Sequence, residues 1–324
     1  MCTAVSYRTN AHYFGRNLDL WYSYDEAVAV TPRNYPFGFR HMPMMDAHYA
    51  MIGMATVVEG YPLYYEATNE AGLSMAGLNF PGNAVYFPYA EGCDNVTPFE
   101  FIPWVLGQCE NITEARAVLG RINLLGEDFS DELPLSPLHF MISDRDSTIV
   151  AESVAEGLRV YDDPVKILTN NPPFDYHMLN LGNYMNVTAS EPVNRFSDEL
   201  SLEPFSLGMG SIGLPGDMSS PSRFVRAAFV RHNSISDGTE DDSVSQFFHI
   251  LGSVAQPRGC TATADEKYEY TLYSSCCNTD TGVYYYTTYD GIGINAVDMK
   301  RCDPYAGEVI SYPIIRDMQV RWQN

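Results

Sequence analysis

A cysteine at position 2 is the residue of this chain best suited to covalent chemistry. Removal of Met1 would leave a thiol and a free α-amine on one residue, and such groups have ordinary pKa values of about 8.5 and about 7.7–8.0. The amine could then accept the thiol proton near neutral pH without a separate histidine. Because cysteine is small, we expect Met1 to be cut off. Taken alone, a cysteine at this position is the more ordinary result of composition, so the rest of the chain must decide.

The segment Phe14-Gly15-Arg16-Asn17-Leu18-Asp19 contains the charges that such a nucleophile needs. It is predicted to pair with the N-terminal strand in a hairpin, which would bring Arg16 and Asp19 to the Cys2 end. A cation beside a thiol favours the thiolate, and a carboxylate beside an ammonium can orient it. A surface ion pair at a strand end would use the same residues.

Three further segments carry polar groups on turns. In residues 79–82 and 168–174, an asparagine is followed by proline or glycine, which hold the backbone in a fixed turn. An asparagine amide and a backbone N–H are suitable donors for an oxyanion, although a turn-capping asparagine is the simpler interpretation. Residues 216–224 place Arg223 where a Gly/Ser/Pro loop enters a helix, and there the simpler interpretation is a solvated arginine.

The elements that must position these residues are predicted as strands, then helices, then further strands and helices, and finally strands. Apolar and aromatic runs bounded by turn residues predict strands, whereas helical spacing and a capping pair at Asn111 and Glu114 predict helices. The predicted strands are residues 2–7, 13–19, 63–68, 73–80, 140–143, 148–154, 158–161, 268–275, 283–289 and 294–297. The predicted helices are residues 99–106, 111 to about 124, 175–185, 222–230 and 243–253.

Hairpins dominate this order, and regular β-α-β alternation is missing, which argues against a doubly wound parallel sheet. The order suits an α+β fold in which helices cover two antiparallel sheets, a four-layer αββα sandwich. No repeat or low-complexity linker divides the chain. We therefore expect residues 1–324 to form a single domain.

Composition excludes several classes of function. The net charge of −22, from 19 basic and 41 acidic residues, leaves no basic face for a nucleic acid. No signal segment opens the chain and no apolar run reaches about 18 residues, so we expect no membrane partner. The seven cysteines show neither metal-ligand nor disulfide spacing, and a cytoplasmic location fits them best. No metal or organic cofactor is implied.

Five motifs, in order along the chain, resemble the choloylglycine hydrolase family, the N-terminal-nucleophile amidases that include conjugated bile salt hydrolases and penicillin V acylases. They are Met-Cys-Thr at 1–3, Gly-Arg-Asn-Leu-Asp at 15–19, Ala-Gly-Leu-Asn-Phe-Pro-Gly at 76–82, Leu-Thr-Asn-x-Pro-x-Phe at 168–174 and Pro-Gly-Asp-x-Ser-Ser-x-Ser-Arg-Phe at 215–224. The resemblance extends from residue 1 to about residue 300. It implies the four-layer N-terminal-nucleophile hydrolase fold, and many family members are homotetramers.

The resemblance also implies catalytic roles for six residues, namely Cys2, Arg16, Asp19, Asn79, Asn170 and Arg223. In the family, the cysteine is the nucleophile and its freed amine is the base. The two arginines supply positive charge near the thiol, and the aspartate holds the amine. The side chain of Asn170 and the backbone N–H of Asn79 would form the oxyanion hole.

Some residues bear on the substrate. Asn79 favours conjugated bile salts, because bile salt hydrolases typically carry Asn there and penicillin V acylases often carry Tyr. Many relatives place Trp directly after the aspartate, whereas this chain has Leu20 and then Trp21, which puts the local pocket in doubt. Five methionines between residues 42 and 54 could form an adaptable apolar wall or fill a core. Candidate contacts from nearby loops are Tyr22, Tyr24, Phe37 and Tyr61.

The sequence therefore predicts an amidase that cleaves a bile acid from glycine or taurine through a thioester on Cys2. Which of the two amines is preferred stays open. Penicillin V or another N-acyl amide is the alternative substrate for the same groups. A non-enzymatic binding module would not need this set of residues, and a redox role for Cys276 and Cys277 would require a strained bond between neighbours.

Overall fold

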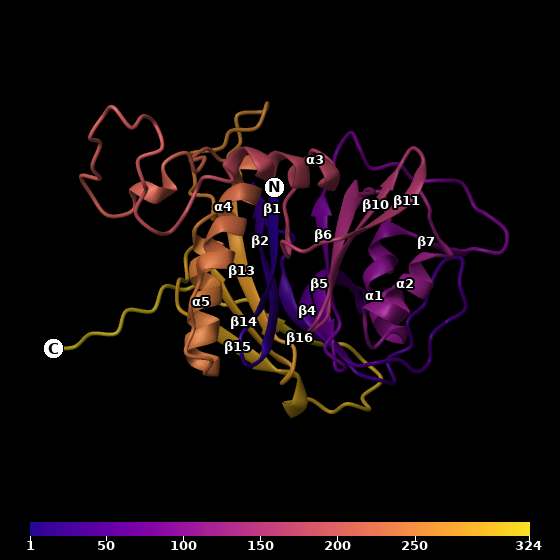
Figure 1. The fold of residues 1–324 in the computed structure, drawn as a ribbon. Helices are drawn as coiled ribbons and strands as arrows, with labels where there is room; N and C mark the ends of the chain where they lie inside the picture. Colours follow the sequence, from indigo (N-terminus) through magenta and orange to yellow (C-terminus); the bar gives the residue numbers. More distant parts are fainter.

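Two antiparallel sheets, stacked face to face, form the centre of the molecule (Figure 1). The structure is a computed structural model that describes residues 1–324. The six-stranded sheet has the order β12-β1-β2-β13-β14-β15, with bounds Ile167–Leu168, Cys2–Arg8, His12–Leu20, Tyr270–Asn278, Val283–Thr288 and Asn295–Asp298. The eight-stranded sheet has the order β11-β10-β9-β6-β5-β4-β3-β16, with bounds Gly157–Asp162, Thr148–Val154, Leu138–Ser143, Ser74–Asn79, Tyr61–Asn69, Met51–Val58, Ala27–Thr31 and Ile310–Pro313.

Helices cover both outer faces of this pair of sheets. On the six-stranded sheet lie α4 (Ser220–Asn233) and α5 (Glu240–Gly252), and on the eight-stranded sheet lie α1 (Pro98–Gln108) and α2 (Ile112–Leu119) (Figure 1). The short α3 (Phe174–Leu181) contacts α4. Three single 3₁₀ turns complete the helices, η1 (Gly182–Tyr184), η2 (Met209–Ser211) and η3 (Met299–Arg301). The predicted α+β class and four-layer αββα sandwich are confirmed.

Two apolar cores hold the four layers together. One lies between the sheets and under α4 and α5, and the other lies between the eight-stranded sheet and α1 and α2. Cys2 belongs to the first core, so the proposed nucleophile is embedded in the body of the protein. Met54 also belongs to the first core and Met51 to the second, whereas Met44 is exposed. At least Met51 and Met54 therefore fill cores rather than line a pocket.

The predicted helix from Asn111 to about Leu124 is wrong at its end. Its start is confirmed, because the side chain of Asn111 accepts from the Glu114 N–H at 3.1 Å. The helix stops at Leu119, and Ile122–Leu124 forms β8, which pairs in parallel with β7 (Asp94–Val96). A partner strand from elsewhere in the chain thus overrides the local helical pattern.

The sequence does not predict the strands β3 and β4, which are neighbours in the eight-stranded sheet. Every residue of β3 is buried, and the first five residues of β4 are buried as well. A strand covered on both faces lacks the alternation of apolar and polar residues by which a strand is recognised in a sequence. Burial on both faces therefore explains why these two strands were missed.

A long arm between η1 and α4 extends away from the body of the protein (Figure 1). Large apolar side chains are exposed along it, namely Met185, Val193, Phe196, Leu200, Leu202, Phe205, Leu207 and Ile212. Concentrated apolar exposure of this kind marks an interaction surface. Among the helices, none has the length and apolarity needed to cross a lipid bilayer.

A substitution at Gly15 can test how closely β2 approaches β13. A Cβ added at Gly15 would lie 2.0 Å from the carbonyl oxygen of Ser275, whereas one added at the exposed Gly38 would have no atom within 4 Å. We expect Gly15→Ala to lower the free energy of unfolding by about 1–3 kcal/mol, the usual cost of overpacking. Urea denaturation measures this, with Gly38→Ala as the control. Equal stability of the two variants would contradict the strand arrangement.

Candidate active site

Cys2 is the first residue of β1, and its neighbours hold its backbone on both sides. Its side chain and backbone together are only 3% exposed. The register of the hairpin places Cys2 opposite Leu18 and Ala4 opposite Arg16. The Cys2 N–H donates to Oδ1 of Asn170 at 2.7 Å, and the Cys2 carbonyl accepts from the guanidinium of Arg223. These bonds hold the start of the chain beside the predicted site residues Asn170 and Arg223.

Asn170 is the residue through which Cys2, Asn79 and Arg223 meet. Its Oδ1 accepts from both the Cys2 N–H and Nη2 of Arg223, each at 2.7 Å. Its Nδ2 donates to the backbone carbonyl of Asn79, also at 2.7 Å. Because an amide nitrogen carries two hydrogens, one N–H of Asn170 is left after the bond to Asn79. Sequence motifs that are about 90 residues apart therefore meet at one side chain.

The backbone of Asn170 is held as firmly as its side chain. Asn170 follows β12, which pairs with β1 through Ala4 and Leu168. Its N–H donates to Oγ of Ser220 at 2.8 Å, and its carbonyl accepts from Nε2 of His177 at 2.9 Å. Burial lowers the pKa of His177 to about 4, so this ring is neutral at physiological pH and donates from Nε2. Asn170 is therefore positioned before any ligand arrives.

Arg223 is a fully buried guanidinium that comes from the first turn of α4. Its Nη1 donates to Oγ1 of Thr3 at 2.7 Å in addition to the Cys2 carbonyl, and its Nε donates to the Met218 carbonyl at 3.1 Å. A buried arginine needs such partners, because its charge cannot be removed by deprotonation. Arg223 thereby connects α4 to the first residues of β1.

Arg16 is the second fully buried guanidinium, and it lies between the two sheets. Its Nη1 donates to the carbonyls of Tyr65 (3.1 Å) and Gly77 (2.5 Å) on the eight-stranded sheet. Its Nη2 is buried and has no hydrogen-bond partner. Burial lowers the pKa of Arg16, but the negative charges around it, led by the Cys2 thiolate, outweigh burial and raise it. Arg16 is thus a charged group with one donor nitrogen free.

Asp19 carries the second buried polar atom of the site that has no hydrogen-bond partner. Its Oδ1 accepts from Oγ1 of Thr271 at 2.6 Å, and its buried Oδ2 has no partner. Burial raises the pKa of the Asp19 carboxyl, and the nearby ammonium of Met1 and guanidinium of Arg223 offset part of that rise. The backbone of Asp19 bonds to both ends of Met1, since its N–H donates to the Met1 carbonyl (2.9 Å) and its carbonyl accepts from the Met1 amine (2.7 Å).

The four predicted substrate contacts fall into different surroundings. Tyr22 and Tyr24 follow β2, directly beyond Asp19, and their hydroxyls are bonded to each other. Tyr61 begins β5 and is half-buried, with its ring against Phe37 and Phe129. Phe37 is completely buried in the second core. Since no part of its ring is accessible, Phe37 cannot contact a ligand in this conformation.

Several residues at the site were not predicted from the sequence. Glu269 accepts from the Met1 amine at 2.8 Å, Thr271 bonds to Asp19, and His177 bonds to the Asn170 carbonyl. Glu269 and Thr271 lie in the β-rich segment around β13, where strand composition hides any functional signal. His177 lies inside a predicted helix. None of the three belongs to a short motif that could have identified it.

The arrangement suits nucleophilic attack by a thiolate. The Cys2 thiol lies near the fixed cation of Arg16, Asn170 binds the Cys2 nitrogen, and one buried oxygen of Asp19 has no partner. His, Cys, Asp and Glu side chains gather nowhere in a group of three that could hold a metal ion, and all seven cysteines are free thiols. Such groups are suited to hydrolysis of an amide by way of a covalent intermediate.

Comparison with known proteins agrees with this chemistry. Residues 2–311 match the family model described as linear amide C–N hydrolases, choloylglycine hydrolase family. The chain is 53% identical to the bile salt hydrolase/transferase of Lactiplantibacillus plantarum over 98% of each protein, and 36% identical to the bile salt hydrolase/transferase of Clostridium perfringens over the full length of both.

Two solved structures have the same fold as this chain. The structure superimposes on a mutant of the conjugated bile acid hydrolase from Clostridium perfringens with a TM-score of 0.92, over the whole of both chains and at 36% identity. A penicillin V acylase from Agrobacterium tumefaciens shares the fold, with a TM-score of 0.76 at 18% identity over 96% of this chain and 90% of that one.

Proposed function

The chain belongs to the choloylglycine hydrolase family of linear amide C–N hydrolases, and from this premise we propose that it cleaves the amide bond of glycine- or taurine-conjugated bile acids. The relatives named as bile salt or conjugated bile acid hydrolases support this substrate. The observation that carries the proposal is the gathering of Arg16, Asp19, Asn170 and Arg223 around Cys2, with one donor of Arg16 and one oxygen of Asp19 left free.

The proposed reaction begins with transfer of the thiol proton of Cys2 to its own free amine. The sulfur attacks the amide carbonyl carbon, and the carbonyl oxygen takes up negative charge. The spare N–H of Asn170 and the backbone N–H of Asn79 donate to this oxyanion. The amine then gives its proton to the departing nitrogen, which leaves as glycine or taurine, and a thioester remains on Cys2.

Water completes the cycle by attack on the thioester. The Cys2 amine accepts a proton from the water as the bond to the acyl carbon forms, and the bile acid leaves as the thiol is restored. Asp19 would hold the ammonium with its free Oδ2, and Arg16 would stabilise the thiolate. Because two of the relatives are named as hydrolase/transferase, an amine is expected to compete with water for the same thioester.

Removal of Met1 is a prerequisite of this mechanism. While Met1 is present, the Cys2 nitrogen is a peptide nitrogen with a single hydrogen, which donates to Asn170. Freed as an ammonium, the same nitrogen would also have a hydrogen for the free Oδ2 of Asp19. We expect intact-mass measurement of active enzyme to show the loss of one methionine residue. Full activity of a protein that retains Met1 would contradict the proposed base.

Asn170 and Asn79 separate the chemistry from the choice of substrate. Asn170→Ala should lower kcat by about 100- to 1,000-fold, the usual loss for one oxyanion donor, with a smaller effect on KM. Asn79→Tyr keeps its backbone N–H, so it should spare the chemistry and raise cleavage of penicillin V relative to bile salts. The measurement is kcat/KM for glycocholate, taurocholate and penicillin V, with Cys2→Ala as the inactive control.

Two outcomes would contradict different parts of this proposal. A kcat near wild type in Asn170→Ala would show that Asn170 does not donate to the oxyanion. A preference of the wild-type enzyme for penicillin V over both bile salts would make penicillin V acylase, the alternative function, the correct one. Tyr22, Tyr24 and Tyr61 are the residues we propose to test next for contact with the acyl group.

We further propose that the enzyme is a cytoplasmic homotetramer of single-domain subunits, as in many family members. The exposed apolar side chains on the arm between η1 and α4 support association. The double change Phe205→Asp and Leu207→Asp should reduce the mass measured by size-exclusion chromatography with light scattering. Ile235→Asp is the control, because Ile235 is equally exposed but lies between α4 and α5. A monomeric wild-type protein would contradict the assembly.

A further inference from the structure

A carboxylate that the proposed mechanism does not use lies between the two sheets beside Arg16. Glu66, on β5, is 2% exposed. Its Oε1 accepts from Oγ of Ser275 at 2.9 Å and from the hydroxyl of Tyr284 at 2.5 Å. Its Oε2 accepts from the hydroxyl of Tyr273 at 2.8 Å. All three donors come from the six-stranded sheet, so Glu66 is a point at which side chains bond one sheet to the other.

Glu66 is also the carboxylate within ion-pair distance of Arg16. The separation between Nε of Arg16 and Oε2 of Glu66 is 3.9 Å, and both side chains are almost completely buried. A second connection runs through Ser275. Its Oγ accepts from the backbone N–H of Arg16 at 3.1 Å and donates to Glu66. Burial raises the pKa of the Glu66 carboxyl, and the Arg16 guanidinium and the three hydroxyl donors offset part of that rise. In its ionised form, Glu66 makes a buried pair of opposite charges with Arg16.

The pair is asymmetric with respect to Cys2. Arg16 keeps one buried nitrogen without a partner, whereas both oxygens of Glu66 accept hydrogen bonds. The carboxylate thus holds Arg16 from one side and leaves the free nitrogen for the thiolate or the substrate. Its negative charge also cancels part of the positive charge that Arg16 directs at the sulfur.

We propose that Glu66 is a positioning residue that holds Arg16 and limits how strongly Arg16 stabilises the Cys2 thiolate. This inference rests on the proposed role of Cys2 as nucleophile. A thiolate that is stabilised too strongly is a weaker nucleophile, because reactivity falls together with the pKa of the thiol. Glu66 therefore balances two requirements, a high fraction of thiolate at neutral pH and a sulfur that still attacks.

The substitution Glu66→Gln removes the charge and keeps the size of the side chain. The readout is the rate of Cys2 alkylation by iodoacetamide as a function of pH in mature enzyme without Met1. Loss of the carboxylate should shift the acid limb of this profile to lower pH, by about one unit for a charge at close range. The plateau rate should then fall about threefold, as expected for a thiol whose pKa is one unit lower.

The sign of this shift depends on all the charged groups that face Cys2 and Arg16. Besides Glu66, they are Asp19 on β2, Arg223 on α4, Glu269 next to β13, Tyr273 on β13 and the amine of Cys2 itself. These groups are unchanged in Glu66→Gln. A shift of the profile can therefore be assigned to the lost carboxylate.

Tyr284→Phe supplies a second test, and it also covers the case that Glu66→Gln does not fold. The Tyr284 hydroxyl bonds to the carboxylate and lowers the pKa of Glu66, so its removal favours the neutral carboxylic acid and leaves less negative charge beside Arg16. The acid limb should therefore move to lower pH, as in Glu66→Gln. If both variants leave the profile unchanged while their stability falls, Glu66 has only a structural role and the inference is wrong.

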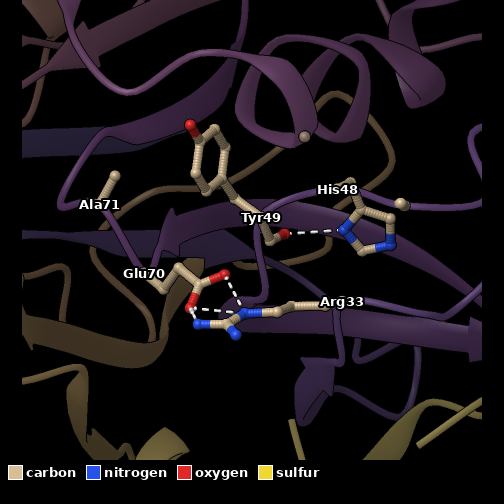
Figure 2. A pocket seen from close by; sticks show the side chains of 7 residues that line it. Arg33, His48, Tyr49, Glu70 and Ala71 are labelled. Atoms are coloured by element: carbon tan, nitrogen blue, oxygen red, sulfur yellow. Dashed lines mark hydrogen bonds and ion pairs between the residues drawn. The ribbon is translucent and has the colours of Figure 1, made fainter. Parts of the chain in front are cut away.

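Glu70→Gln is the matched control. Glu70 follows the same strand four residues later, and its carboxylate is bonded to Arg33, with Nε to Oε1 at 2.8 Å and Nη2 to Oε2 at 2.6 Å. Figure 2 shows this ion pair beside His48 and Tyr49 in a cavity of about 540 Å³ whose lining includes none of the residues around Cys2. This variant loses a partly exposed ion pair and should keep the wild-type alkylation profile. An equal shift in Glu70→Gln would overturn the specific role of Glu66.

The proposed function and this inference fail in distinguishable ways. If alkylation of Cys2 in the wild-type enzyme leaves bile-salt hydrolysis intact, Cys2 is not the nucleophile and the proposed function falls. If alkylation abolishes hydrolysis but the profile of Glu66→Gln matches that of wild type, the nucleophile stands and the role of Glu66 falls.

Discussion

The charge of Arg16 is buried between two sheets, and much of the surrounding structure follows from that constraint. A guanidinium stays protonated in any protein environment, and the effective cost of removing an ion from water is several kcal/mol unless partners replace the water. Here the guanidinium comes from the six-stranded sheet and finds partners on the eight-stranded sheet, in the carbonyls of Tyr65 and Gly77 and the carboxylate of Glu66. The sandwich is therefore held at this level by polar contacts, while apolar packing holds it elsewhere.

A second constraint is that Cys2, close to the start of the chain, must be held in a fixed position. The first residues of a protein are usually poorly ordered unless they are tied down. Cys2 is tied down because β1 lies between β2 and β12 inside a sheet, because Arg223 binds its carbonyl, and because Asn170 binds its nitrogen. Cys2 lies on a strand and Arg223 on a helix, and Asn170 lies in the turn directly after β12, which gives more precise placement than a long loop would.

Fold and substrate are decided by different parts of the molecule. A penicillin V acylase shares the four layers at 18% identity, so the layers alone do not select a bile acid. The groups around Cys2 lie on regular elements, whereas the candidate acyl contacts Tyr22 and Tyr24 lie in a loop beyond β2. Loops carried on a rigid scaffold can vary without disturbing it. A shared mechanism can thus serve several acyl groups within one family.

The sequence by itself determined the elements with a local signature, such as the β1–β2 hairpin and the cap at Asn111, and its ordered motifs identified the residues that gather around Cys2. Only the tertiary structure decided what holds them. Glu66 bonds to Tyr273 and Tyr284 across more than 200 residues of chain, and such contacts leave no periodicity or motif. The strands β3 and β4 were hidden for a related reason, since burial on both faces removes the alternation that marks a strand. Local patterns record local geometry, whereas partners brought together by sheet stacking exist only after the chain has folded.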